Sequence, residues 1–220
     1  MNRRAVLASV SATTASAIAG CSTPTSRTRP AEFDDCSQSI ILAGNLPNPV
    51  VSEVETALES GQYQTPGDLR LQEVMGPNTT HIRVSGQYVE PRIDADDETT
   101  TLVLEESIPR QGDHELPIRN RTGEDIDAAI TVTYQPPGND GDPETIRDDR
   151  LELSVGESET APEAWHRYGQ YTLEIEFDDS DPLEESWSIS QGTTLHGLTL
   201  ESTTRVQLDL SVADIDPCRW

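Results

Sequence analysis

The sequence predicts a mainly β protein in which a small α+β module is followed by an antiparallel β-sandwich. Three observations support this fold class. Apolar and polar residues alternate in many short runs, and Gly, Pro, Asn and Asp separate these runs. Only one stretch of the chain after the first twenty residues has the spacing of an amphipathic helix. The length of 220 residues allows one large domain or two small ones.

The chain is strongly acidic and contains no lysine. It has 40 Asp and Glu against 15 basic residues, all of them Arg, for a formal net charge of -25. Such a charge is repelled by nucleic acid, so we exclude a nucleic-acid binder. The sequence has no apolar run long enough for a multi-span membrane protein, and its three Cys are too few for a disulfide-dense scaffold.

The first twenty residues have the parts of an export signal. Arg3 and Arg4 supply the charge, and residues 5–20 form a short, weakly apolar stretch that ends in small residues. This stretch is shorter than the roughly 20 apolar residues that a permanent span requires. The adjacent Arg pair indicates the twin-arginine route, which exports folded cargo.

Residues 17–21, with the sequence AIAGC, resemble a lipobox. The resemblance implies cleavage before Cys21 and a lipid attached to that cysteine; the alternative is an ordinary signal with a chance Cys. Residues 21–35 are rich in Ser, Thr and Pro and have little to bury. We therefore expect them to form a flexible tether between the lipid and the folded part.

The mature chain from residue 21 onward has 13 basic and 40 acidic residues, a charge of -27. With the absence of Lys and the twin-arginine lipoprotein signal, this composition resembles the surface proteins of halophilic archaea. In about 1 M salt the Debye length is only about 3 Å, so dense carboxylates stop repelling one another. An acidic surface protein from a low-salt environment is the alternative.

We predict a disulfide between Cys36 and Cys218. These two cysteines remain as an even pair once Cys21 is acylated, and the export signal places them in an oxidising compartment. The bond would close a loop of about 180 residues, for which the chain-entropy model gives roughly 5 kcal/mol of stabilisation. Free thiols are the alternative, because two Cys without a nearby His make a poor metal site.

Residues 36–109 form the predicted α+β module. Residues 39–43 (SIILA) are a short strand, and a helix follows with Asn48 as N-cap, Pro49 as first helical residue and Gly61 as the stop. Its apolar stripe consists of Val50, Val51, Val54, Ala57 and Leu58. Its opposite face carries Glu53, Glu55 and Glu59, which we expect to be solvated; an acidic docking face is the alternative.

After Gly61 the apolar spacing changes to two, as in Leu69 and Leu71. Two further runs, at residues 82–84 and 102–104, have the same spacing, and turn signals separate the runs. We expect one helix packed on a small antiparallel sheet that ends near Pro109. The arrangement loosely resembles small α+β modules of haloarchaeal surface proteins, and this resemblance implies no particular activity.

Residues 113–220 form the predicted sandwich, after a boundary at residues 110–113 where the two parts could hinge. Strand-like alternation covers residues 116–118, 126–134, 151–155, 171–177 and 206–212. Residues 136–141 and 178–182 are clear turns. Alternation with a period of two means that each sheet buries one face, and two such sheets pack into a sandwich.

This half resembles an immunoglobulin-like domain. The Gly169-x-Tyr171-x-Leu173 pattern resembles the tyrosine corner at the start of strand F, with Leu173 in the place of the antibody cysteine. LPIRNRT at residues 116–122 and LELSVG at residues 151–156 are the other strands that carry the resemblance. The disulfide and the Trp of antibody domains are absent, which indicates a surface-protein type. Cadherin-like and fibronectin-like sandwiches share the pattern.

The sequence has no motif of a known active site. G-x-S-x-G, the P-loop, G-x-G-x-x-G and H-E-x-x-H are all absent. The four histidines, His81, His114, His166 and His196, lie on separate segments without ligand spacing. Acidic clusters at residues 94–98 and 178–185 lack the pattern of a calcium loop. We therefore predict no catalytic residue, no metal site and no cofactor.

Asn78 and Asn120 begin N-x-Thr sequons on predicted turns and are candidate glycosylation sites; unmodified turn Asn is the alternative. Together these features predict a non-enzymatic protein, lipid-anchored at the outer face of the cell membrane. It would display an interaction or structural module for another surface protein or a glycan. The alternative is an accessory lipoprotein that binds a small ligand or a cation for a transport system.

Overall fold

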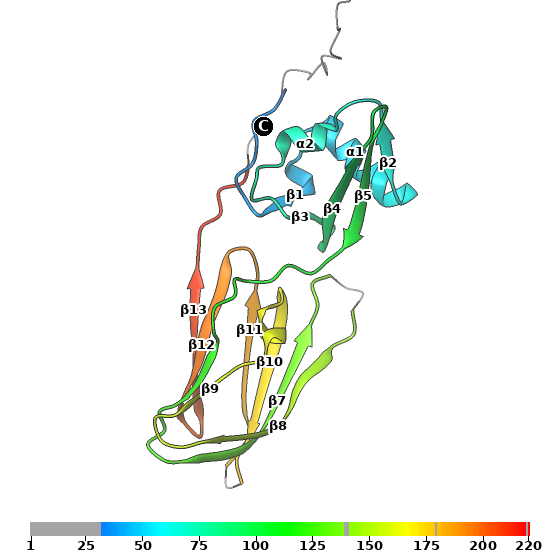
Figure 1. Ribbon diagram of the computed structural model, residues 1–220. Coiled ribbons are helices and arrows are strands. Elements are labelled where there is room, and N and C mark those ends of the chain that lie inside the picture. Colours follow the sequence, from blue (N-terminus) through cyan, green and yellow to red (C-terminus); the bar gives the residue numbers. More distant parts are fainter. Residues whose placement is uncertain (1–31, 139–140, 179, 219) are drawn as a thin grey trace, which may run out of the picture. The chain divides into compact units, whose positions relative to one another are not determined.

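The computed structural model describes residues 32–138, 141–178, 180–218 and 220 (Figure 1). The predicted export signal with Arg3 and Arg4, the predicted lipid-attachment residue Cys21 and residues 21–31 of the tether lie outside the described residues. The described chain is mainly β, as predicted, with an α+β module followed by two mostly antiparallel sheets. None of its helices is long and apolar enough to cross a membrane.

The module contains a five-stranded sheet in the order β1-β3-β4-β5-β2, in which only the β1–β3 pair is parallel. Its apolar core combines Val50 and Val54 of the first helix with Ile82 and Leu102 of the sheet. The elements are β1 (Ile40–Leu42), η1 (Ala43–Asn45), α1 (Asn48–Ser60), β2 (Tyr63–Thr65), α2 (Arg70–Val74), β3 (His81–Val84), β4 (Gln87–Ala95) and β5 (Thr100–Glu106).

Helix α1 begins one residue earlier than predicted. Asn48 is its first helical residue, and Pro47 is the N-cap, without a side-chain hydrogen bond to the helix. The structure therefore corrects the assignment of Asn48 as the cap. Gly61 ends the helix as predicted, because its φ of 79° lies in the left-handed region that a residue without Cβ adopts most easily.

The structure also corrects the assignment of Glu53 to a solvated face and of Leu69 and Leu71 to a strand. Residues 70–74 form helix α2, which buries Leu71 and Val74. Glu53 is only 5% exposed. Its carboxylate accepts hydrogen bonds from the backbone N–H groups of Arg70 (3.0 Å) and Leu71 (2.9 Å). A carboxylate from α1 therefore caps the N-terminus of α2.

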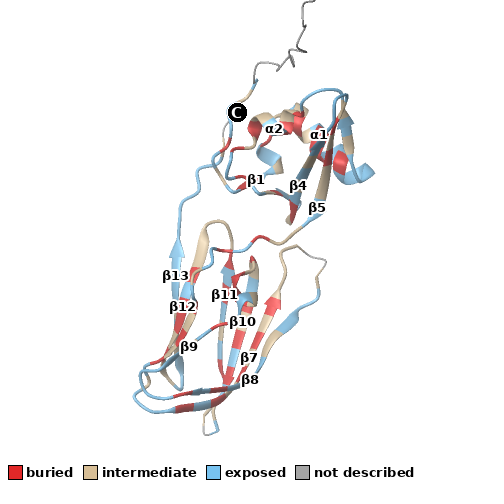
Figure 2. Ribbon diagram, viewed as in Figure 1, coloured by how far each residue is buried: buried red, intermediate tan, exposed pale blue. Residues whose placement is uncertain are grey.

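The sandwich contains two four-stranded sheets, in the orders β11-β10-β7-β8 and β13-β12-β6-β9. Buried and exposed positions alternate along β7 and β10, as the sequence predicts (Figure 2). The elements are β6 (Pro117–Asn120), β7 (Ile126–Gln135), β8 (Glu144–Leu153), β9 (Ser158–Thr160), η2 (Glu163–His166), β10 (Gly169–Glu176), β11 (Leu183–Ile189), β12 (Thr193–Ser202) and β13 (Arg205–Val212).

The strand pairing is immunoglobulin-like. Hairpins β10–β11 and β7–β8 flank the central β7–β10 pair, which is the arrangement of strands G, F, C and C′ in variable-type domains. In the second sheet β6 and β9 are antiparallel, like strands B and E. Strand β12 lies beside β6 in the place of strand A, but it is parallel to β6 and comes from the C-terminal side of the chain. A C-terminal hairpin thus replaces strand A.

Tyr171 forms the tyrosine corner that the sequence predicts. Its hydroxyl donates to the backbone carbonyls of Arg167 (2.6 Å) and Ala164 (3.2 Å). Its ring stacks on Trp187 with a centroid distance of 5.2 Å. Gly169 is required nearby, because a Cβ at this position would lie 2.5 Å from the Tyr134 ring. Burial raises the pKa of Tyr134 to about 12, so its hydroxyl keeps its proton and donates to the carbonyl of Tyr168 at 2.8 Å.

The last predicted strand is buried only along its first half. Val206 and Leu208 pack against the core of the sandwich, whereas Leu210 and Val212 are 38% and 79% exposed. Val155, which the alternation places in a strand, lies beyond the end of β8 and is 56% exposed. β13 is an edge strand, so part of its apolar face has no second sheet to cover it.

The predicted disulfide between Cys36 and Cys218 is present. The two Cα atoms lie 5.7 Å apart, and the cysteines are separated by 182 positions in the sequence. The last residues of the predicted tether contact the module, since the backbone N–H of Glu32 donates to Glu73 (2.8 Å) and Phe33 packs on its core. The described end of that segment is therefore part of the folded module.

Candidate functional site

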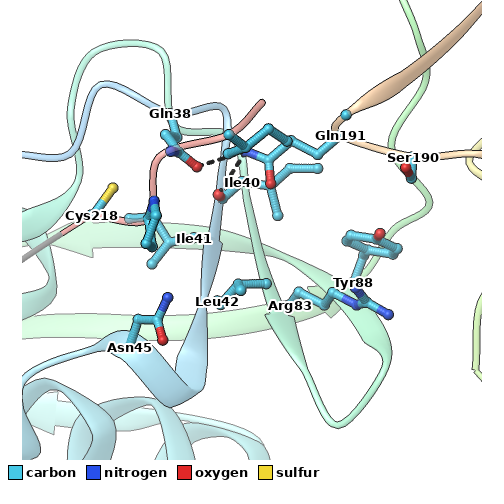
Figure 3. Close-up of a pocket in the computed structure, with 13 residues that line it drawn as sticks. Gln38, Ile40, Ile41, Leu42, Asn45, Arg83, Tyr88, Ser190, Gln191 and Cys218 are labelled. Carbon is cyan, nitrogen blue, oxygen red and sulfur yellow. Dashed lines mark hydrogen bonds between the residues drawn. The ribbon is translucent and has the colours of Figure 1, made fainter. Parts of the chain in front are cut away.

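A cavity of about 250 Å³ lies where the module meets the C-terminal segment, and we call it the junction groove. Figure 3 shows its lining. The module contributes Leu42 of β1, Arg83 of β3 and Tyr88 of β4. The other wall comes from the β11–β12 turn at residues 190–192 and from Ile215 in the C-terminal segment.

Hydrogen bonds of two glutamines hold the two walls together. Gln191 donates its amide to the side-chain oxygen of Gln38 (3.1 Å) and to the backbone carbonyl of Ile40 (3.0 Å), as the dashed lines in Figure 3 show. Gln38 in turn donates to the backbone carbonyl of Asp216. Because Cys218 also lines the groove, its disulfide to Cys36 fixes the C-terminal wall covalently.

Tyr88 and Arg83 form the polar end of the groove. Tyr88 is 6% exposed, and its ring meets the edge of Tyr168 at a centroid distance of 5.8 Å. The Arg83 guanidinium carbon lies 5.6 Å from the centroid of the Tyr88 ring. Burial raises the pKa of Tyr88, and the positive charge of Arg83 partly offsets this rise. The Tyr88 hydroxyl has no hydrogen-bond partner among the described residues.

The groove differs in charge from the rest of the chain. No Asp or Glu is among the described residues that line it, although 40 of the 220 residues are acidic. An adjoining hollow of about 560 Å³ shares Arg83, Tyr88 and Ser190, and its described lining also lacks a carboxylate. Arg83 is the one charged residue among the described residues that line the two cavities.

Three of the four histidines are brought together at one end of the sandwich, although they lie on separate segments. The His114 ring lies 5.4 Å from that of His166 and 5.3 Å from that of His196, measured between centroids. His114 donates through Nε2 to the carbonyl of Leu195 at 2.7 Å. His166 lies in η2 and donates through Nδ1 to the carbonyl of Gly112 at 3.1 Å. The fourth histidine, His81, bonds to Ser107 through Nε2 (3.2 Å).

The surroundings of His166 favour its neutral imidazole. Desolvation lowers the pKa of His166, and the nearby charges of His114 and Arg110 lower it further, whereas the carbonyl of Gly112 and Asp113 act in the opposite direction. Across the described residues, no group of three or more His, Cys, Asp or Glu side chains is arranged to hold a metal ion. The three histidine rings therefore lie close together, but the described residues around them do not form a metal-binding site.

The two sequons have different environments. Asn78 lies on a turn and is exposed. Asn120 is fully buried, and its amide nitrogen donates to the carbonyls of Glu124 (2.8 Å), Leu153 (2.9 Å) and Ser154 (3.2 Å). A sugar on Asn120 would replace a hydrogen of this nitrogen and break the turn. In the folded protein only Asn78 is accessible to a glycosyltransferase.

The acidic cluster at the β4–β5 turn is explained by local structure. Asp96 accepts hydrogen bonds from the backbone N–H groups of Glu98 (2.8 Å) and Thr99 (2.7 Å). These bonds lower the pKa of Asp96, and they close the hairpin. The Asp96 carboxylate is thus a turn-forming group.

The junction groove has no local signature in the sequence. Its walls come from β1, β3, β4, the β11–β12 turn and the C-terminal segment, so no local motif contains it. One signal was present: residues 36–52 and 186–200 are two long runs without any Asp or Glu, and both contribute to the groove. Comparisons with protein-family models, curated proteins and solved structures found no match for this chain.

Proposed function

We propose that this protein is a non-enzymatic interaction or structural module, anchored by a lipid at Cys21 to the outer face of the cell membrane in a high-salt environment. In this proposal residues 1–20, with Arg3 and Arg4, direct export by the twin-arginine route. The module and the sandwich are then displayed outside the cell, where the junction groove binds a partner.

The observation that carries the proposal is the lack of carboxylates among the described residues that line the junction groove. Carboxylates hold water and cations strongly, so a surface that must be desolvated on binding is best built without them. The groove combines amides and hydroxyls with exposed apolar side chains, Leu42 at 41% and Ile215 at 38%. This mixture is typical of a protein-recognition surface.

The disulfide supports a location outside the cytoplasm. Disulfides persist in oxidising compartments and are rare in the cytosol. The exposed sequon at Asn78 is compatible with glycosylation of a protein exported in its folded state, whereas the buried Asn120 is not. We therefore propose Asn78 as the glycosylation site.

An accessory lipoprotein that binds a small ligand or a cation is the second candidate, and the cavities themselves favour it. The junction groove, at about 250 Å³, is slightly smaller than typical small-molecule sites of roughly 300–1,000 Å³. The adjoining hollow is within that range, and it shares Arg83, Tyr88 and Ser190 with the groove. Two cavities that share part of their lining offer an extended partner more contact than either cavity offers a small ligand.

The test is isolation of membranes in molar salt, gentle cross-linking and identification of co-purifying proteins, with Cys21→Ser as the released control. A stoichiometric partner that depends on Cys21 supports the proposal. A protein that is membrane-bound but without partner contradicts the interaction role and favours the ligand-binding alternative. If the wild-type protein and the Cys21→Ser variant are both released from the cell, the lipid anchor is disproved.

A further inference from the structure

We propose that Arg83 and Tyr88 form a carboxylate-recognition site in the junction groove, and that its ligand is an extended acidic segment of a partner protein with an apolar side chain next to the carboxylate. This inference rests on the proposed interaction function and names the chemistry of the partner.

Arg83 carries a positive charge that no ion pair among the described residues neutralises. The chain has nearly three carboxylates for each arginine, so most arginine side chains have a carboxylate near enough for an ion pair. Among the described arginines, seven form ion pairs: Arg70, Arg92, Arg110, Arg147, Arg150, Arg167 and Arg205. Arg83, Arg119 and Arg121 form none, and Arg83 is the one of these three that lines the groove, where no Asp or Glu is among the described lining residues. The planar guanidinium of Arg83 remains free to bind a carboxylate with two parallel hydrogen bonds.

The Tyr88 hydroxyl is a second polar group of the groove. Although 94% of Tyr88 is buried, its hydroxyl oxygen itself remains open to solvent and can donate a hydrogen bond to a ligand. Tyr88 lines both cavities, and its hydroxyl has no described partner. In Figure 3 the Tyr88 ring lies beside Arg83, whose guanidinium carbon is 5.6 Å from the ring centroid. In this proposal an oxygen bound to Arg83 also accepts a hydrogen bond from the Tyr88 hydroxyl.

Apolar side chains in the groove favour a peptide over an acidic glycan. Besides its amides and hydroxyls, the groove lining contains the exposed side chains of Leu42 and Ile215. A glycan presents hydroxyls to these side chains, whereas a peptide can place a Leu or Ile side chain on them, with an apolar gain proportional to the area covered. In molar salt the repulsion between two acidic proteins is screened beyond about 3 Å, so direct contacts decide the binding.

The experiment measures fluorescence anisotropy in molar KCl with the oxidised mature chain carrying Cys21→Ser. The probe is a labelled hexapeptide of alternating Leu and Asp, and its matched form has Asn in place of Asp. We expect the Asp peptide to bind and Arg83→Gln to weaken binding by about tenfold or more. Tyr88→Phe keeps the ring and removes only the hydroxyl, and we expect a loss of roughly three- to tenfold.

Arg121→Gln is the matched control, because Arg121 is exposed, forms no ion pair among the described residues and lies outside the groove. It removes the same charge, and binding should not change. Equal affinity for the Asn peptide, equal losses for Arg83→Gln and Arg121→Gln, or binding of oligogalacturonate but not of the peptide would each overturn the inference. If a partner co-purifies in the membrane experiment equally with wild type and Arg83→Gln, the proposed function stands and this inference fails.

Discussion

Glu53 joins the two helices of the module through one buried carboxylate. A helix of five residues, such as α2, cannot form alone, because nucleation is unfavourable and its first N–H groups have no partners within the helix. The Glu53 oxygens accept from two of those groups, and a negative charge at a helix N-terminus is favourable. One side chain of α1 thus supplies the local stability that α2 lacks.

Replacing this carboxylate tests its role. Glu53→Gln keeps the size of the side chain but turns an amide NH₂ toward backbone donors, so at least one of the two hydrogen bonds is lost. We expect the free energy of unfolding to fall by about 1–3 kcal/mol, measured by denaturant titration in molar salt. Glu55→Gln on the exposed face of the same helix should change it by no more than about 0.5 kcal/mol. Equal effects of both changes would rule out the capping role.

Individual elements differ in how well the sequence predicts them. The five alternating apolar residues of β7, from Ile126 to Tyr134, are all buried, because burial of one face of a strand leaves a period-two signature. The tyrosine corner is equally local, since the Tyr171 hydroxyl bonds to a carbonyl only four residues earlier. Elements that are stabilised by near neighbours in sequence can therefore be predicted from sequence.

Elements that depend on distant residues were missed. Leu69 and Leu71 have the spacing of a strand, but the cap from Glu53, 17 to 18 positions earlier, selects a helix. The junction groove depends on Gln191 reaching Gln38, 153 positions away. The histidine cluster requires three segments to converge at the end of the sandwich. Such convergence leaves no spacing pattern in the sequence.

His166 and His81 predict a pH dependence of stability. Burial lowers the pKa of His166 and also that of His81, so both lie below the unfolded value of about 6.5. In the window below about 6.5 the unfolded chain therefore binds more protons than the folded one, and the free energy of unfolding falls as the pH drops. Denaturant titrations between about pH 7.5 and pH 5.5 should show this fall, before most carboxylates titrate.

The variant His166→Gln measures how much His166 contributes to this pH dependence. The glutamine amide can still donate to the carbonyl of Gly112 but carries no titratable group, so the fall in stability between these pH values should be smaller than in the wild type. A wild-type stability that does not change over this range would contradict the prediction. So would an unchanged fall in the His166→Gln variant.

For the molecule as a whole, the disulfide joins the start of the folded chain to its end. Cys36 is buried in the module, and its backbone N–H donates to the carbonyl of Val74 at 2.8 Å, so this end of the bond is fixed. The residues before Cys218, by contrast, lie outside any strand and form one wall of the junction groove. The bond thus secures a segment that has few other restraints.

Removal of the bond should lower stability and open the groove. Cys36→Ser with Cys218→Ser should reduce the free energy of unfolding by up to about 5 kcal/mol, the chain-entropy value for a loop of this length. Hydrogen exchange at the Ala213 amide, which donates to the carbonyl of Gly192 at 2.8 Å, should become faster, while β7 and β10 keep their protection. Cys21→Ser is the control, and unchanged exchange at Ala213 would show that other contacts hold this segment.

The net charge makes the stability of the whole molecule depend on salt. With 40 acidic and 15 basic residues, the carboxylates outnumber the arginines by 25. Some of them face each other directly, as Glu174 and Glu184 do on neighbouring strands. Opposite side chains in a sheet have Cβ atoms about 4.5–5.5 Å apart. This distance exceeds the Debye length of about 3 Å at 1 M salt but not the 10 Å at 0.1 M.

We therefore expect the midpoint of thermal unfolding to fall when KCl is lowered from molar concentration to about 0.1 M. Sucrose strengthens apolar burial without screening charge, so sucrose at 0.1 M KCl should not restore the midpoint fully. Glu184→Gln removes one side of the facing pair and should stabilise the protein by roughly 0.2–1 kcal/mol at 0.1 M KCl, but by much less in molar KCl. If the gain is the same at both salt concentrations, it does not come from relief of charge repulsion. If sucrose replaces salt completely, strengthened burial of apolar surface, and not screening of the carboxylates, is what the protein requires from its environment.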